Sequence, residues 1–406
     1  MTSPWQHHTL AGVRTVAPTA GVHLTPERLA LQRTARAFAM DEVLPVANEL
    51  DPRHEDIPAA LLARMAELGY FGLLVAKEDG GLGLGVFDYC LVSEELARAW
   101  MSVASIIARG NGTGCDTPDP ARRAELRKRS AAGDWIGSIA FSEPQAGSDL
   151  ANVACSAVRD GDGWVVTGTK RWVGNALAAD FVHLLARTRP PGEGQSRSDG
   201  LELFLVEKRR GAFPDGMTGR PIEKIGYFGL TTWQLELNRL RLPLSALQDT
   251  GQAEGQGFKD SLRWLGTGRV QTAARAVGLA RGALEDALAY SRQRVQFGEP
   301  LAEQQVLRHR LADMAADVEA ARQLWQHAAW LLDAGEPCDV ETSQAKLVAS
   351  EMAERVTSQA LQIFGGNGYT TEHAVERYWR DARLTTIFEG TSEIQRKIIS
   401  DALLAG

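Results

Sequence analysis

One carboxylate near the end of the chain has the surroundings of a general base. Glu389 follows the apolar pair Ile387-Phe388 and precedes Gly390, so a turn can direct its carboxylate toward an apolar site. Burial of that kind favours the protonated carboxyl group and suits it to taking up a proton. Ser392 and Gln395 have the spacing of a capping box, which predicts a helix with Ser392 as its cap. The alternative is that Glu389 only complements the dipole of that helix.

A second segment with chemical groups is Phe141–Asp149. Ser142 and Ser148 supply hydroxyl groups, and Gly147 allows a ligand to come close to the backbone. The segment lies where helical periodicity gives way to the first predicted strand. Its composition alone is equally that of an ordinary polar loop.

The composition is that of a protein with a large core. The chain has 406 residues, of which 44% are hydrophobic and 23% charged, and this length suffices for two or three domains. A net charge of −7 argues against a nucleic-acid partner. The four cysteines are scattered without a C-x-x-C pair, which indicates neither a metal site nor a disulfide framework. No stretch approaches the roughly 20 apolar residues of a membrane span, and we expect a cytoplasmic protein without a membrane partner.

Helical signals dominate the first third of the chain. Thr25 followed by Pro26 predicts the start of a helix. A second helix is predicted through Leu61–Leu68, ending near Gly69. The glycine-rich segment 80–85 lacks the pattern of a dinucleotide-binding loop, and we expect a turn that lets backbones approach closely.

The middle of the chain has the period of strands, and the last third is helical again. Strands are predicted at 164–166, 181–185, 201–206 and 233–238. An apolar stripe from Leu307 to Leu331 is typical of a helix in a bundle core. We therefore expect an α+β fold, with an N-terminal helical domain at 1–135, a β domain at 136–246 and a C-terminal helical bundle at 247–406.

These motifs, in this order, resemble the acyl-CoA dehydrogenases, a family of flavoproteins. Two further matches support the resemblance: Arg294-Val295-Gln296-Phe297-Gly298 fits the family's Arg-x-x-Phe-Gly, and Gln362–Tyr369 fits its Gln-x-x-Gly-Gly-x-Gly-Tyr. The match extends from about Leu24 to Leu404. It implies FAD as the cofactor and a middle β-barrel between the N-terminal helices and a C-terminal four-helix bundle.

The resemblance also implies roles for individual residues. Glu389 would remove the α-proton of an acyl thioester, and Trp172 would pack against the flavin ring, although a barrel-core position is the alternative for this side chain. The segment from Gln362 would meet the FAD of a neighbouring subunit, which implies a homodimer or homotetramer. The residues implied to bind FAD are Phe141, Ser142, Gly147, Ser148, Trp172, Val173, Gly174, Arg294, Phe297, Gln305, Gln362, Gly365, Gly366, Thr391 and Glu393.

A smaller set of residues is implied to bind the substrate. Arg109 would lie near the closed end of the acyl site, where a cation could recognise an anionic tail; alternatively it turns outward or pairs with a protein carboxylate. The residues of this set are Ser148, Arg269, Gly390 and Arg109.

Three glycines occupy positions where relatives often have functional side chains. Gly174 replaces a Ser or Thr that bonds flavin N5, and Gly266 replaces an Asp that helps hold CoA. Some relatives place the catalytic carboxylate at the position of Gly268, so Glu389 has no competitor here.

The expected activity is dehydrogenation of an acyl-CoA to a trans-2-enoyl-CoA, with electrons passing to an electron-transfer flavoprotein, as in fatty acid metabolism. An acyl group on a carrier protein is an alternative substrate, because Gly266 weakens the expected hold on CoA. A flavin hydroxylase and a non-catalytic flavin-binding scaffold are further alternatives, and the presence of Glu389 argues against both.

Overall fold

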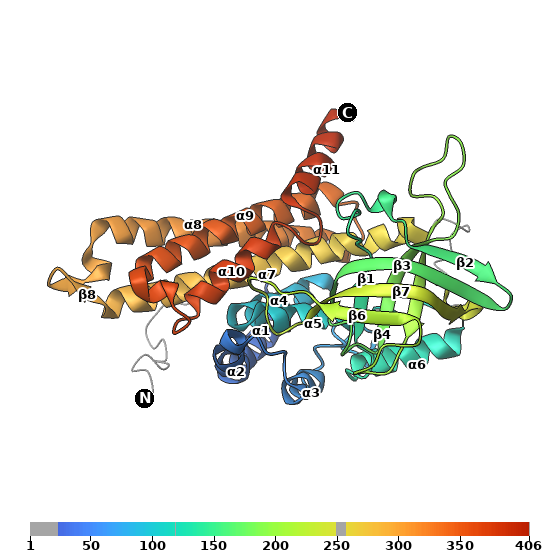
Figure 1. Cartoon of the computed structure of the whole chain (residues 1–406). Coiled ribbons are helices and arrows are strands. Elements are labelled where there is room, and N and C mark those ends of the chain that lie inside the picture. The colour runs from blue at the N-terminus through green and yellow to red at the C-terminus, as the bar shows by residue number, and fades with distance from the viewer. Residues whose placement is uncertain (1–22, 118, 249–256, 406) are drawn as a thin grey trace.

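The computed structural model describes residues 23–117, 119–248 and 257–405 (Figure 1). Helices form the N-terminal part, a sheet forms the middle and long helices form the C-terminal part, which confirms the α+β fold class. Among the described helices, none has the length and apolar character needed to cross a membrane.

One N-terminal helix, α4 (Val86–Ala99), lies at the centre of the helical part. This helix is buried along almost its whole length, because α1 (Pro26–Phe38) and the C-terminal helices α7 (Gly257–Gln293) and α8 (Gln305–Ala334) pack against it. Thr25 caps α1 through its Oγ1, which accepts a hydrogen bond from the backbone N–H of Arg28, and Pro26 occupies the first turn, as predicted. The helices of this part are α1 (Pro26–Phe38), a π-helical segment (Ala39–Val43), α2 (Leu44–Leu50), α3 (Ala59–Glu67), α4 (Val86–Ala99), α5 (Met101–Ile106) and α6 (Pro120–Ala131).

The glycine-rich segment 80–85 is a loop, as predicted. A side chain on Gly81 would come within 2.1 Å of the carbonyl oxygen of Val75, so only glycine permits this approach of two backbones.

Seven strands of the middle part form one sheet in the order β1-β4-β2-β3-β7-β6, with β5 also paired to β4. All four predicted strands are present, as β3, β4, β5 and β7. Three short strands, β1, β2 and β6, were not predicted. The strands are β1 (Gly137–Ala140), β2 (Ser156–Asp160), β3 (Gly163–Gly174), β4 (Phe181–Arg187), β5 (Leu201–Glu207), β6 (Met217–Pro221) and β7 (Thr232–Pro243).

Long helices that run back and forth form the C-terminal part (Figure 1). Helix α7 carries the chain away from the sheet, and a hairpin of β8 (Val295–Gln296) and β9 (Glu299–Pro300) stands at the far end. The predicted apolar stripe lies on α8. The helices are α7 (Gly257–Gln293), α8 (Gln305–Ala334), α9 (Asp339–Phe364), α10 (Val375–Thr385) and α11 (Ser392–Leu404).

A network of buried charges joins the N-terminal and C-terminal helices. Arg98 of α4 pairs with Glu285 of α7 at 2.9 Å, and Arg281 of α7 pairs with Glu95 of α4 at 2.5 Å. Arg36 of α1 contacts Glu285 at 3.0 Å. Burial alone would raise the pKa of Glu285, but the three guanidinium groups outweigh it and lower this pKa to about 2. Ion pairs as well as apolar packing therefore stabilise the contact between the N-terminal and C-terminal helices.

Candidate active site

Glu389 lies on a rigid turn between α10 and α11. Its backbone has φ of 54° and Gly390 has φ of 84°, so two successive residues adopt the left-handed conformation. For a residue with a side chain this conformation is uncommon, and it persists where the surroundings enforce it. Two donors reach the Gly390 carbonyl oxygen: Lys346 Nζ at 2.7 Å and Gln395 Nε2 at 2.9 Å. They fix the turn and the direction of the Glu389 side chain.

The cap of α11 differs from the prediction. Thr391, not Ser392, is the capping residue, and its Oγ1 accepts a hydrogen bond from the backbone N–H of Ile394 at 3.4 Å. Ser392 is the first helical residue and its hydroxyl is buried. Gln395 bonds the Gly390 carbonyl oxygen instead of closing a capping box, because the left-handed turn brings that oxygen over the first helical turn.

The Glu389 side chain is exposed, and the predicted enclosure of this carboxylate is wrong for the chain by itself. The physical reason is that a glycine faces it: a side chain built on Gly268 of α7 would come within 3.2 Å of Glu389 Oε2. Apolar surface next to this residue comes from the Phe388 ring, which meets Tyr227 edge-on with centroids 6.0 Å apart. The carboxylate therefore faces open space beside an aromatic wall.

Cationic side chains gather around this turn. Burial lowers the pKa of Lys346 to about 8, and the charge of Glu389 acts in the opposite direction. Arg275 of α7 stacks over the Phe388 ring at 4.8 Å. Neither residue was predicted as part of the site. Arg275 interrupts a run of small and apolar residues on α7, and this pattern is a signal that could have identified it.

The segment Phe141–Asp149 is held by a buried ion pair. The Glu143 carboxylate accepts hydrogen bonds from Lys170 Nζ at 2.7 Å and from the backbone N–H groups of Ala154 and Cys155 at 2.8 and 3.0 Å. Burial lowers the pKa of Lys170, whereas Lys170 and these donors outweigh burial and lower the pKa of Glu143. The pair was not predicted, and it gives the loop a fixed shape.

Gly147 and Ser148 lie exposed on this fixed loop, and Ser142 and Phe141 are half-buried. The loop thus presents backbone groups and hydroxyls outward while its anchor stays in the core.

Trp172 points away from the core of the sheet. Lys170 pairs with Leu235 and Val173 pairs with Trp233, so two residues of β3 oppose one residue of β7 in a bulge. Trp172 has φ of 65° at this bulge and is 56% exposed, so it is not a core side chain. The backbone N–H of Arg171 donates to the Ser142 carbonyl oxygen at 2.9 Å, which places the loop beside the indole.

These features fit a flavin. An exposed indole next to backbone and hydroxyl groups matches a planar heteroaromatic ring with polar edges. The side chain of Val173 is buried in the sheet core, so only its backbone is available to such a ligand. Thr391 and the exposed Glu393 stand at the start of α11.

The remaining predicted cofactor residues lie far from Glu389. Arg294 and Phe297 belong to the hairpin segment after α7, and Tyr290 near that end stacks on Phe364 with centroids 4.1 Å apart. Phe297 is 97% exposed. Gly268 and Arg294 are 26 positions apart (294 − 268), which corresponds to ~39 Å along a helix. Gln305, Gln362, Gly365 and Gly366 lie at this same distal end.

A single chain therefore does not gather all predicted cofactor residues around one flavin. Figure 1 shows the hairpin and the sheet at opposite ends of the molecule.

The predicted substrate residues are separated as well. Arg269 is buried and pairs with Asp339 at 3.1 Å, at the start of α9. Arg109 is half-buried, and its Nη1 donates to the Ser105 carbonyl oxygen at 3.1 Å. It forms no ion pair with a carboxylate among the described residues.

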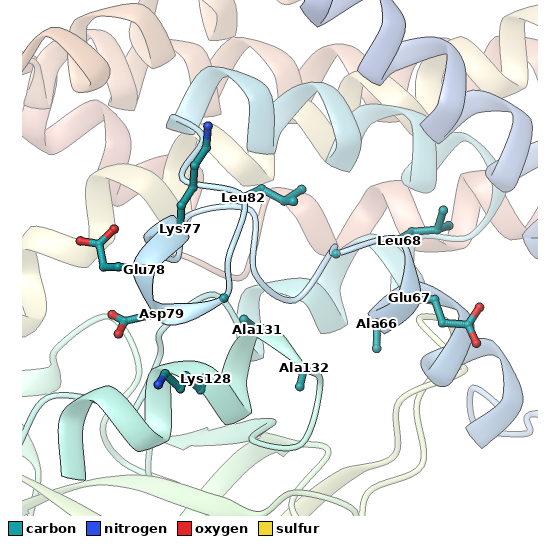
Figure 2. A pocket seen from close by; sticks show the side chains of 12 residues that line it. Ala66, Glu67, Leu68, Lys77, Glu78, Asp79, Leu82, Lys128, Ala131 and Ala132 are labelled. Carbon is teal, nitrogen blue, oxygen red and sulfur yellow. The ribbon is translucent and has the colours of Figure 1, made fainter. Parts of the chain in front are cut away.

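A surface hollow between α3 and α6 is unrelated to this site (Figure 2). Its side chains carry both charges, including Glu67, Asp79 and Lys128, and none of the predicted site residues lines it. We assign no chemistry to it.

Three family models match consecutive parts of the chain. They are the acyl-CoA dehydrogenase N-terminal domain at residues 25–128, the middle domain at 138–240 and the C-terminal domain at 255–404.

Individual relatives match along almost the full chain. A (2S)-methylsuccinyl-CoA dehydrogenase of Cereibacter sphaeroides is 39% identical over 91% of this chain and 68% of its own length. The mitochondrial short-chain specific acyl-CoA dehydrogenase of Bos taurus is 38% identical over 94% of this chain and 91% of its own. The solved butyryl-CoA dehydrogenase of Megasphaera elsdenii has a TM-score of 0.87 at 32% identity, covering 95% of this chain and 100% of that one. The chain therefore belongs to the acyl-CoA dehydrogenase family of flavin-dependent oxidoreductases.

Proposed function

We propose that this acyl-CoA dehydrogenase binds FAD and uses Glu389 to remove the α-proton of a short acyl-CoA, which leaves as the trans-2-enoyl-CoA. The observation that carries the proposal is the left-handed turn, which holds the exposed Glu389 carboxylate beside Gly268. A general base needs this combination of fixed direction and room for the reacting carbon.

Different groups of the turn have different roles in the proposed reaction. The bond between Cα and its hydrogen breaks, and the proton moves to a carboxylate oxygen of Glu389. The developing negative charge on the thioester oxygen needs a preorganised donor, and the backbone N–H of Glu389 can supply one. Lys346 acts as a positioning residue, because its bond to the Gly390 carbonyl oxygen fixes the peptide groups of the turn.

The second hydrogen leaves Cβ with its electron pair as the double bond forms. When bound, FAD supplies the acceptor for this hydride. The Phe141–Asp149 loop and the Trp172 indole would orient the flavin ring, and the aromatic wall of Phe388 and Tyr227 would shield the reacting carbons from water.

The names of the relatives support a short acyl group on CoA as the substrate. We further propose that electrons pass to an electron-transfer flavoprotein, that the protein is a cytoplasmic homodimer or homotetramer, and that FAD lies between two copies of the chain. The distal position of Arg294 and Phe297 supports this shared cofactor site.

The variant Glu389→Gln tests the base. We expect it to keep its flavin and to lose about 100-fold to 10,000-fold in turnover, because the amide cannot accept the proton. The control is Glu336→Gln, which makes the same change at an exposed position after α8. Turnover of Glu389→Gln equal to that of the control would refute the assignment.

The carrier of the acyl group is tested with the wild-type protein. Anaerobic addition of butyryl-CoA should bleach the visible absorption of the flavin. Bleaching by butyryl-carrier protein but by no CoA thioester would replace CoA with a carrier protein in this proposal.

A further inference from the structure

Two guanidinium groups meet at Ser105 of α5. Arg109, which follows α5, donates from Nη1 to the Ser105 carbonyl oxygen at 3.1 Å. Arg275 of α7 donates from Nη1 to the Ser105 hydroxyl at 2.6 Å and from Nη2 to Thr272 Oγ1 at 2.8 Å. The Nε atoms of both arginines are buried and have no acceptor within the described residues.

Neither guanidinium has a carboxylate partner in the part of the chain that the structure describes. Arg275 is only 3% exposed. By contrast, Arg98, Arg281 and Arg322 of the same helical core each contact at least one glutamate. An unpaired buried cation is costly unless an anion approaches it. Burial lowers the pKa of Arg275, although Tyr227, Glu389 and Tyr89 act to raise it.

Both arginines lie next to the proposed reaction centre. Arg275 covers the ring of Phe388, the residue before Glu389. A methyl group added to Gly174 would come within 2.6 Å of Nη2 of Arg109, so Arg109 occupies the space that a larger side chain on β3 would take. Arg109 thus lies beside the end of β3 and Arg275 beside the Glu389 turn, and both contact Ser105.

We propose that Arg109 and Arg275 together bind a second carboxylate of the acyl group, and that the substrate is the CoA thioester of a short dicarboxylic acid. The planar guanidinium forks suit a carboxylate, which can accept hydrogen bonds at both oxygens. The inference rests on the proposed function, because it assigns the thioester end of the same molecule to Glu389. We infer a short acid because Arg275 covers the ring of Phe388, the residue next to the proposed base.

Paired substrates test this proposal in the wild-type protein. Succinyl-, glutaryl- and adipyl-CoA are compared with butyryl-, valeryl- and hexanoyl-CoA, in which a methyl group replaces the distal carboxylate. We expect kcat/KM for the best dicarboxylic substrate to exceed that of its neutral counterpart by about 100-fold. Preference for the neutral series would overturn this inference and leave the proposed function intact. Reaction with neither series would instead contradict the proposed function for CoA thioesters.

Variants assign the preference to the two arginines. We expect Arg109→Met and Arg275→Met each to lower the ratio of kcat/KM for the dicarboxylic substrate to kcat/KM for the neutral substrate by about 10-fold to 100-fold. Arg159→Gln, at an exposed position on β2, serves as the control. Equal loss for both substrates would show a structural role and overturn the inference.

A binding measurement separates recognition from catalysis. In a Glu389→Gln background, calorimetric titration with the dicarboxylic acyl-CoA measures its Kd without turnover. Arg275→Lys, which keeps the charge and loses the fork, should fall between wild type and Arg275→Met. An unchanged Kd in Arg109→Met and Arg275→Met would contradict the proposal even if either variant lost activity.

Discussion

The surroundings of Glu389, the proposed base, could be predicted only in part from the sequence. Its apolar neighbours and the following glycine indicated a turn, and the turn is present with its left-handed geometry. The exposure of the carboxylate could not be predicted, because it depends on the residues that the fold brings near it, such as Gly268 of α7. Thr391 and Ser392 are adjacent and both are residue types that cap helices, so only the backbone path decides between them.

No local sequence pattern identifies Lys346 as a residue of the candidate site. Its side chain nevertheless stabilises the turn that carries the proposed base. It lies on α9 among residues of ordinary helical periodicity, and its Nζ reaches the Gly390 carbonyl oxygen only in the folded chain. Such a residue is found from contacts and not from motifs.

We expect Lys346→Met to lower kcat by about 10-fold to 100-fold and to change KM little, because the peptide groups that support the transition state lose their anchor. Lys346→Arg should restore part of kcat, since it returns a donor to the carbonyl oxygen. Steady-state kinetics with the flavin content measured in parallel provide the test. A change confined to KM would show that Lys346 contributes to substrate binding instead.

At the scale of elements, hydrophobic period identified the long helices and the four longer strands. The short strands β1, β2 and β6 escaped prediction because four or five residues carry too little periodicity, and β6 contains Gly219 and Pro221. The bulge at Trp172 was also unpredictable, because it is defined by the register of β3 against β7. The fold class therefore follows from sequence, whereas the orientation of the indole requires the paired strands.

The Glu285 carboxylate of α7 stabilises the packing of α7 against α4. The stability of the fold in acid therefore tests this ion pair. Its pKa of about 2 in the folded state lies below the usual value of 4.5. This carboxylate therefore stabilises the fold fully above about pH 4.5, and the contribution is lost as pH falls toward 2.

We expect Glu285→Gln to lower the free energy of unfolding at neutral pH by about 3 kcal/mol, because three guanidinium groups lose a buried partner. Its stability should also fall less than that of wild type between pH 4.5 and pH 2. Glu49→Gln is the control, since Glu49 forms only an exposed pair with Arg53 at 2.8 Å. Urea denaturation at several pH values measures both effects, and equal losses in the two variants would contradict the assignment.

At the scale of the whole molecule, the candidate cofactor residues divide into two groups at opposite ends of α7. The family resemblance implied a role in FAD binding for both groups. The ~39 Å between them could not be predicted, because it depends on α7 being one continuous helix. Arg294 and Phe297 would then serve the flavin of another copy.

We expect Arg294→Ala to weaken FAD binding by about 100-fold without changing the mass of the assembly, because the guanidinium fork would contact the cofactor and not the partner chain. Arg292→Ala, an exposed arginine in the last turn of α7, is the matched control. The flavin-to-protein ratio after gel filtration and the mass by light scattering are the measurements. Full flavin content in Arg294→Ala would exclude a role for the distal end in cofactor binding.

The length of α7 has a genetic consequence. If each site takes its base from one chain and its distal arginine from another, two inactive variants can complement each other. In a dimer of a Glu389→Gln chain and an Arg294→Ala chain, one site carries both defects and the other carries none. Random reassociation of equal amounts should therefore restore about a quarter of the sites, whereas sites contained within single chains would restore none. The same rule would let two different loss-of-function alleles, expressed in one cell, yield an active enzyme.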